Sequence, residues 1–209
     1  PHGMLEPYSL NQKKIIKQIF WSILQKYIFK FSDQIIVNSY NEKKNLSKMV
    51  DHNNVIVIPH GIEIKTQKYY KKKNLKKSLN FVFFSRIDSV KNLDKLIDIW
   101  RSNIFFKKIN LSIYGEPSNQ EYFRLIKNKI SGSKNIQYHG PLNKNKIKVL
   151  TKYDVFIFPS NSENFGLVVL EAMAAGLYVI LNKHLPWKSI ASEGFASLIN
   201  FNNKSLINE

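Results

Sequence analysis

The sequence predicts an α/β protein built on doubly wound parallel sheets, and three features of the chain predict it. Short apolar runs alternate regularly with amphipathic segments from residue 80 onward, which is the rhythm of strands and crossover helices. The apolar runs are continuous rather than alternating, as in strands that are covered on both faces. Residues 154–181 hold two such runs around an alanine-rich segment, and this makes one strand–helix–strand unit.

Six strands and five helices are expected in this later part of the chain. We place the strands at 81–85, 110–114, 135–138, 154–158, 177–181 and 196–199, and the helices at 93–106, 119–130, 144–151, 166–175 and 186–192. Right-handed crossovers would then put helices on both faces of one parallel sheet.

The first part of the chain follows the same rhythm less completely. Helices are expected over 11–30 and 41–49, and strands over 34–38 and 55–58. A lysine-rich, poorly periodic stretch over 63–79 is typical of a solvated linker. We therefore expect residues 1–67 to be the end of a first Rossmann-like domain with its linker. Residues 68–209 would be a second such domain, without its last helices.

Both ends of the sequence suggest a fragment. The chain starts at Pro1 without a methionine, and it stops just after Asn202 and Asn203, either of which could cap a helix that has barely begun. We expect truncation at both ends.

The expected helix over 11–30 carries one apolar stripe opposite a row of lysines. Its apolar positions are Ile15, Ile16, Ile19, Phe20, Ile23, Leu24, Tyr27 and Ile28. A stripe of this kind is usually packed into a core. The alternative is adsorption to an anionic membrane surface, since lysines flank the stripe and Trp21 and Phe29 are interfacial aromatics.

The bulk composition limits the function classes. The net charge of +17 raises the alternative of a basic nucleic-acid-binding module. Only three of the 32 basic residues are arginine, which argues against it because arginine dominates base and bidentate phosphate recognition. There are no cysteines, no apolar run of about 18 residues and no recognisable signal peptide. A cytoplasmic location is the expectation, with a peripheral position at the inner face of the membrane as an addition.

The stretch over 154–181 also indicates chemistry. Ligands of parallel sheets gather beyond the carboxyl ends of the strands, and anions bind the amides at a helix start. Glu163 lies in the loop and Glu171 on the helix, about 7.5 Å beyond its first amides at about 1.5 Å per residue. Carboxylates beside an anion site suit hydroxylated partners such as sugars. The plainer interpretation is that Glu163 is favoured by the dipole at the helix start and that Glu171 is a solvated helix residue.

The whole string P-S-x-x-E-x-F-G-x-x-x-L-E-A-M-A-x-G-x-x-V-I resembles the signature of glycosyltransferase family 4. These are retaining enzymes of GT-B architecture that use nucleotide-sugar donors. The resemblance implies that Glu163 holds the donor sugar and Glu171 the ribose. It also implies donor contacts at the helix start, from Asn164, Phe165, Gly166 and Leu167.

The stretch after the first strand of the second part, SRIDSVKN, resembles the motif of the same family that begins G-R-[LI] and ends K-[GN]. There Arg86 and Lys91 would hold the donor pyrophosphate, and Ser85 replaces the usual glycine. Taken alone, they could be two surface cations beside a helix start. Together with Glu163, they form our predicted catalytic set.

Three further residues are implied to line the donor site. Gly115 ends the second strand, where the family lets the backbone approach the nucleotide, although the usual second glycine is absent. Pro141 and Leu142 follow Gly140 in a turn whose backbone reads the base in the family. The earlier Pro59-His60-Gly61-Ile62 resembles the family's first-domain ending, with His60 where asparagine is usual.

No metal site and no cofactor are predicted. There is no D-x-D pair, and the five histidines are scattered along the chain. We therefore expect a retaining glycosyltransferase in surface polysaccharide or lipopolysaccharide biosynthesis, with a nucleotide-sugar donor and a glycan or lipid-linked acceptor. Alternatives are a phosphorylase of similar architecture and a nucleic-acid module using residues 65–77.

Overall fold

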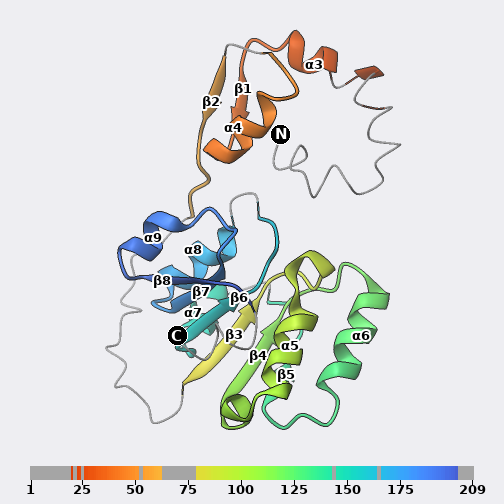
Figure 1. Ribbon diagram of the computed structural model, residues 1–209, viewed down its shortest axis with the longest axis vertical. Helices are drawn as coiled ribbons and strands as arrows, with labels where there is room; N and C mark the ends of the chain where they lie inside the picture. The colour runs from red at the N-terminus through yellow and green to blue at the C-terminus, as the bar shows by residue number, and fades with distance from the viewer. Residues whose placement is uncertain are drawn as a thin grey trace. The chain divides into compact units, whose positions relative to one another are not determined.

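The computed structural model describes residues 20, 23–24, 26–51, 54–62, 79–142, 145–163 and 166–201, coloured along the chain in Figure 1. The chain divides into two compact units. The first unit is Pro1–Gly61 with Glu163–Gly166, and the second is Ile62–Ser162 with Leu167–Glu209.

The first unit contains a small parallel strand pair. Its elements are α3 (Lys26–Lys30), β1 (Ile35–Val37), α4 (Tyr40–Leu46) and β2 (Val55–Val57), with Ile35 of β1 opposite Val55 of β2. The Ser39 hydroxyl caps α4 by accepting from the Glu42 N–H at 3.1 Å. The Glu42 carboxylate accepts from the Asn38 N–H at 2.8 Å. Reciprocal bonds of this kind fix a helix start.

Most of the expected helix over 11–30 lies outside the described residues, as does most of the expected linker over 63–79. Within the described part of the helix, the apolar residues of the stripe are exposed, from Leu24 at 46% to Ile23 at 69%, whereas Phe29 packs against the small core of the first unit.

The second unit is organised around one six-stranded sheet. Its strands are β3 (Asn80–Phe84), β4 (Asn110–Tyr114), β5 (Ile136–Tyr138), β6 (Val155–Phe158), β7 (Tyr178–Asn182) and β8 (Ala196–Ile199). They pair in the order β5-β4-β3-β6-β7-β8, and every pairing is parallel. The doubly wound parallel sheet expected from the sequence is confirmed.

The strand order reverses between β3 and β6, which are neighbours in the centre of the sheet. Phe81 lies opposite Val155, and the Asp154 carboxylate accepts a hydrogen bond from the Asn80 N–H at 2.9 Å. In sheets of this kind, the crevice at the carboxyl ends of the two strands that flank such a reversal is where ligands bind.

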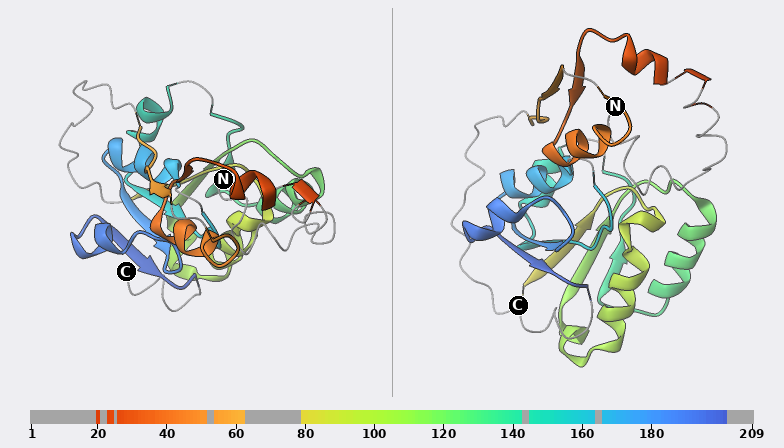
Figure 2. Two further views of the ribbon diagram at one scale, coloured as in Figure 1. Left: turned by 90° about the horizontal axis from the view of Figure 1, so that it is seen from above. Right: turned by 45° about the horizontal axis from the view of Figure 1, so that its top comes forward.

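The helices of the second unit fall into two groups. They are α5 (Leu93–Ser102), α6 (Gln120–Ile130), α7 (Lys146–Leu150), α8 (Leu167–Ala174) and α9 (Lys188–Ser192), with short 3-10 turns η2 (Ser89–Lys91) and η3 (Ile104–Lys108). In Figure 1 and the right-hand view of Figure 2, α5 and α6 run side by side. Right-handed crossovers place α5 and α6 on one face and α7, α8 and α9 on the other.

The core of the second unit is aromatic around α5. The Trp100 ring stacks on Phe106 at 4.5 Å between centroids and meets the Phe81 ring edge-on at 5.1 Å. Its indole N–H donates to the Ile109 carbonyl at 3.0 Å. This satisfies the one polar atom of a side chain that is only 1% exposed.

Apart from the helix over 11–30, the expected elements agree with the structure to within a few residues, with one correction. The helix expected over 93–106 is interrupted at Asn103, whose backbone is extended (φ −104°, ψ 125°). The Asn103 side chain instead accepts from the Phe105 N–H at 2.9 Å and caps η3. Asparagine competes with the helix for backbone donors in this way, and apolar periodicity does not reveal it.

Candidate functional site

The loops after β3 and β4 are joined to each other at the carboxyl edge of the sheet. The Ser85 N–H donates to the Tyr114 carbonyl at 3.2 Å, and the Ile87 N–H donates to the Glu116 carbonyl at 2.9 Å. The Ser118 hydroxyl donates to the Asp88 carboxylate at 2.8 Å. The ladder between the two strands therefore continues into their loops, and this fixes the backbone on either side of Arg86.

Gly115 is required by this joining. A Cβ atom at this position would lie 1.8 Å from the Ser85 carbonyl oxygen, a distance that no side chain tolerates. The Gly115 carbonyl also accepts from the Tyr138 hydroxyl at 2.8 Å. The glycine therefore lets two backbones approach each other. The nucleotide contact expected from the sequence stays a prediction.

The two predicted pyrophosphate-binding cations flank one carboxylate. Arg86 is exposed, whereas Lys91 is 6% exposed and its ammonium lies 5.6 Å from the centre of the Phe158 ring. Burial alone would raise the pKa of Asp88. Its hydrogen bonds and the charges of Arg86 and Lys91 outweigh burial, and the pKa lies below its ordinary value. Two cations thus lie near Asp88, and the ammonium of one of them, Lys91, lies over the last residue of β6.

Asn92 connects the Lys91 turn to the loop after β6. Its backbone is left-handed (φ 52°, ψ 32°), a conformation in which asparagine is enriched. Its side chain donates to the Pro159 carbonyl at 3.1 Å and accepts from the Asn161 amide at 3.1 Å. The loops that follow the two central strands are therefore held together by side-chain amides.

Glu171 lies on α8 beside a lysine that the sequence motif does not include. The Lys146 ammonium donates to Glu171 Oε1 at 3.2 Å and lies 5.5 Å from the centre of the Phe84 ring. Glu171 Oε2 is buried and has no hydrogen-bond partner among the residues that the structure describes. An unpartnered buried carboxylate oxygen is costly, so a donor supplied by a ligand would stabilise it.

The remaining predicted donor residues are distributed as follows. Glu163 and Gly166 belong to the first compact unit, and Gly166 has a left-handed φ of 71°. Asn164 and Phe165 lie outside the described residues. Leu167 is the first residue of α8 and is 41% exposed. Arg86, Lys91 and Glu171 are thus the charged predicted residues that the second unit brings to its carboxyl edge.

The turn after β5 lies beside an aromatic cluster. Pro141 is exposed, and Leu142 packs against the core. The His139 ring stacks on Tyr114 at 4.9 Å, and its Nε2 is 3.2 Å from the Ser112 hydroxyl. Burial lowers the pKa of His139. A neutral, stacked imidazole gives the turn after β5 a flat and largely uncharged surface.

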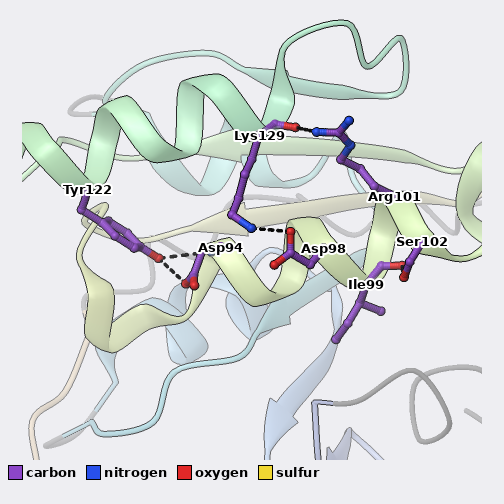
Figure 3. Close-up of polar contacts among 7 residues, drawn as sticks. All are labelled: Asp94, Asp98, Ile99, Arg101, Ser102, Tyr122 and Lys129. Carbon is purple, nitrogen blue, oxygen red and sulfur yellow. Dashed lines mark hydrogen bonds and ion pairs between the residues drawn. The ribbon is translucent and has the colours of Figure 1, made fainter.

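A hollow of about 740 Å³ lies elsewhere, between α5 and α6. Arg101, Tyr122 and Lys129 are among the residues that line it, and Figure 3 shows their polar contacts. The Tyr122 hydroxyl donates to the Asp94 carboxylate at 2.7 Å, the Lys129 ammonium binds Asp98, and the Arg101 guanidinium donates to the Lys129 carbonyl. We call these five residues the helix brace. Its polar side chains are paired with one another or with a backbone carbonyl.

Within the described ranges, no three side chains of the metal-binding types lie together, and no helix is long and apolar enough to span a bilayer.

Comparisons with known proteins identify relatives. The family described as "Glycosyl transferases group 1" matches residues 65–209. A Klebsiella pneumoniae relative, "Uncharacterized 41.2 kDa protein in cps region", is 27% identical across 97% of this chain and 57% of its own length. The Streptococcus agalactiae "UDP-N-acetylglucosamine--peptide N-acetylglucosaminyltransferase GtfA subunit" is 29% identical across 78% of this chain and 33% of its own.

Solved structures share the fold. Anabaena Alr3699/HepE in complex with UDP and glucose matches 100% of this chain and 59% of its own, with a TM-score of 0.78 and 18% identity. WaaG, described as a glycosyltransferase involved in lipopolysaccharide biosynthesis, matches 95% of this chain and 62% of its own, with a TM-score of 0.70 and 16% identity. This chain thus spans 62% or less of each of these four proteins.

Proposed function

This chain belongs to the group 1 glycosyl transferases, and we propose that it forms part of an enzyme that moves a sugar from a nucleotide-sugar donor to an acceptor hydroxyl. The transfer would retain the configuration at the anomeric carbon. Residues 68–209 would form the Rossmann-like domain that binds the donor. Residues 1–67 would belong to the acceptor-side domain and its linker.

The observation that carries this proposal is the charge arrangement at the carboxyl ends of β3 and β6. Lys91 and Lys146 each place an ammonium over the last phenylalanine of a central strand, Phe158 and Phe84 respectively. Glu171 presents a buried oxygen at the same edge, and this oxygen has no partner among the described residues. A cation such as Lys91 can bind a diphosphate, and an acceptor such as Glu171 can bind sugar hydroxyls, so the edge offers both groups that a nucleotide sugar requires.

The chemistry follows from these charges. Departure of the nucleoside diphosphate is the demanding step, and cations fixed in advance stabilise the negative charge that develops on it. Arg86 and Lys91 would bind the pyrophosphate, assisted by the backbone amides of Asn164, Phe165, Gly166 and Leu167. Gly115, Pro141 and Leu142 would line the nucleotide.

The two glutamates would have separate roles, and a binding experiment tests them. In the full-length protein, Glu171→Ala should weaken binding of the bare nucleoside diphosphate, since Glu171 holds the ribose that both ligands contain. Glu163→Ala should weaken mainly the intact sugar donor. Isothermal titration with UDP and with UDP-sugars measures both affinities. UDP is chosen because it is bound in the HepE structure. Equal losses for both ligands in both variants would remove the assignment.

Two relatives support a role in surface polysaccharide or lipopolysaccharide synthesis. The Klebsiella protein is described as lying in a cps region, and WaaG as acting in lipopolysaccharide biosynthesis. The acceptor would then be a glycan or a lipid-linked glycan, and the reaction would take place in the cytoplasm. Incubating full-length protein with labelled UDP-sugars and lipid-extracted acceptors, and finding label only in water-soluble products, would argue against a lipid-linked acceptor.

A peripheral membrane contact is part of the same proposal. The described part of the stripe over 11–30 exposes its apolar residues, including Phe20 at 51% and Tyr27 at 53%. Exposed aromatic residues beside lysines suit an anionic lipid surface. Full-length protein should co-sediment with anionic vesicles at low salt, and Lys13→Glu, Lys14→Glu and Lys17→Glu together should reduce this binding. Protein that stays in the supernatant at low salt would indicate a packed helix.

A further inference from the structure

An ion pair at the carboxyl edge joins Glu171 to a residue that has no assigned role. Lys146 is the first residue of α7, and its ammonium donates to Glu171 Oε1 at 3.2 Å. The Lys146 side chain is 40% exposed and that of Glu171 is 19% exposed. The pair is therefore partly open to solvent on the lysine side.

The position of the ammonium is fixed by more than one contact. It lies 5.5 Å from the centre of the ring of Phe84, the last residue of β3. A cation over an aromatic face is attracted to it. The ion pair and the ring together hold the ammonium at the end of a central strand, where ligands of parallel sheets bind. An ammonium carries three N–H donors, so donors remain after the bond to Glu171.

A ribose hydroxyl needs both a donor and an acceptor, because its oxygen accepts and its hydrogen donates. A carboxylate alone only accepts, and an ammonium alone only donates. A carboxylate and an ammonium side by side satisfy both halves of one hydroxyl, or of two neighbouring hydroxyls.

We propose that Lys146 is a second ribose-binding residue: Glu171 accepts a hydrogen bond from a ribose hydroxyl while Lys146 donates one to a ribose hydroxyl oxygen. This inference rests on the proposed function, in which Glu171 holds the ribose. It extends the donor site to α7, which carries none of the motif residues.

The competing account is an ion pair that only ties α7 to α8. A partly exposed pair of this kind contributes little to folding stability. The two accounts differ in their ligand dependence. A tie between helices affects all ligands equally, whereas a ribose contact disappears when the hydroxyl is removed.

The experiment measures affinity for a nucleotide with and without its ribose hydroxyls. Full-length protein is titrated with whichever of UDP, GDP and ADP binds most tightly, and with its 2′-deoxy and 3′-deoxy analogues. Lys146→Met should weaken the ribonucleotide by about tenfold, the loss of one charge-assisted hydrogen bond. The same variant should weaken binding of at least one deoxy analogue by less than about twofold. Lys148→Met, at an exposed lysine of the same helix, should change none of these affinities.

Two further variants separate the explanations. Lys146→Gln keeps an N–H donor without the charge and should recover part of the discrimination between ribose and deoxyribose. Equal losses for all three ligands in Lys146→Met, or identical behaviour of Lys146→Gln and Lys146→Met, would overturn the proposal. Glu171→Gln tests the premise. If it leaves the ribonucleotide affinity unchanged, the ribose role of Glu171 itself fails. If it lowers that affinity and Lys146→Met does not, only the role of Lys146 fails.

Discussion

The carboxyl edge of the sheet and the helix brace between α5 and α6 are both rich in charged groups, but they differ in how these groups are satisfied. In the brace, Tyr122 pairs with Asp94, Lys129 with Asp98, and Arg101 with a backbone carbonyl (Figure 3). At the edge, a buried oxygen of Glu171 has no partner among the described residues. The hollow of about 740 Å³ lies beside the brace, whereas this Glu171 oxygen lies at the edge.

The difference shows why volume alone is a poor guide to a site. A ligand entering the hollow must break bonds that the brace already makes or bind beside them, and exchanging one partner for another yields little free energy. A ligand at the edge supplies a partner that is absent, and so it removes a desolvation penalty. Removing a ligand-binding charge at the edge should therefore mainly weaken binding, whereas removing a brace group should mainly lower stability.

The largest effect is expected at Gly115, because the edge depends on a backbone contact that no side chain permits. Gly115→Ala should lower the free energy of unfolding by about 3 kcal/mol or more, since the new Cβ overlaps the Ser85 carbonyl. Chemical denaturation monitored by circular dichroism measures it. Gly132→Ala is the control: it has a positive φ of 75° but open space around it, so it should cost only about 1–2 kcal/mol. Equal losses would show that conformation, and not the contact, governs both positions.

Replacing one arginine by alanine in each region gives the next largest expected effect, a difference in nucleotide binding. Arg86→Ala should weaken nucleoside diphosphate binding by about 1.5–3 kcal/mol while leaving unfolding unchanged, because an exposed cation that binds phosphate contributes little to the fold. Arg101→Ala, in the brace, should leave binding unchanged. Isothermal titration of both variants measures the contrast. If Arg101→Ala lost as much affinity as Arg86→Ala, the brace would belong to the nucleotide-binding site.

A smaller effect is expected from the brace hydroxyl. Tyr122→Phe removes the group that donates to the Asp94 carboxylate and accepts from the Asp94 N–H. It should lower the free energy of unfolding by about 1 kcal/mol without changing nucleotide affinity. Thermal unfolding together with titration checks this. Weaker binding at unchanged stability would reverse the roles of the two regions.

The smallest effect is a pH dependence at the edge. The pKa of Asp88 in the folded protein lies below its ordinary value of 3.8, so its bonds stabilise the fold above that value and are lost as the pH falls through the lowered one. The difference in melting temperature between wild type and Asp88→Asn should therefore shrink as the pH falls from about 5 to about 2. A difference that stays constant across this range would mean that the charge of Asp88 is not involved.

The sequence predicted the sheet well because strand identity depends on local patterns. Continuous apolar runs marked β3 and β6, whose central positions are buried on both faces, and the motif residues Arg86, Lys91 and Glu171 lie at their carboxyl edge. The role of Gly115 in the contact with Ser85 was not visible, since it depends on two backbones that meet in space. The sequence indicated only that Gly115 would let the backbone approach the nucleotide.

Lys146 carried no signal at all. It is one of many lysines in a basic chain, and its partner Glu171 lies 25 residues further along. Asn92 was visible only as the last position of a motif, and its bonds to Pro159 and Asn161 span 67 and 69 residues. Contacts of this range arise from the strand order, which apolar periodicity does not encode.

The pairing of β3 with β6 also has a consequence for the order of events in folding. The Asn80–Asp154 bond joins residues 74 positions apart, whereas β3 and β4 are joined by a single crossover. Closing a long loop costs more chain entropy and is slower than forming local contacts. We expect the half of the sheet with β3, β4 and β5 to form early, and the junction that carries Lys91 and Glu171 to be completed last. A nascent chain would then gain its nucleotide affinity only in the final step of folding.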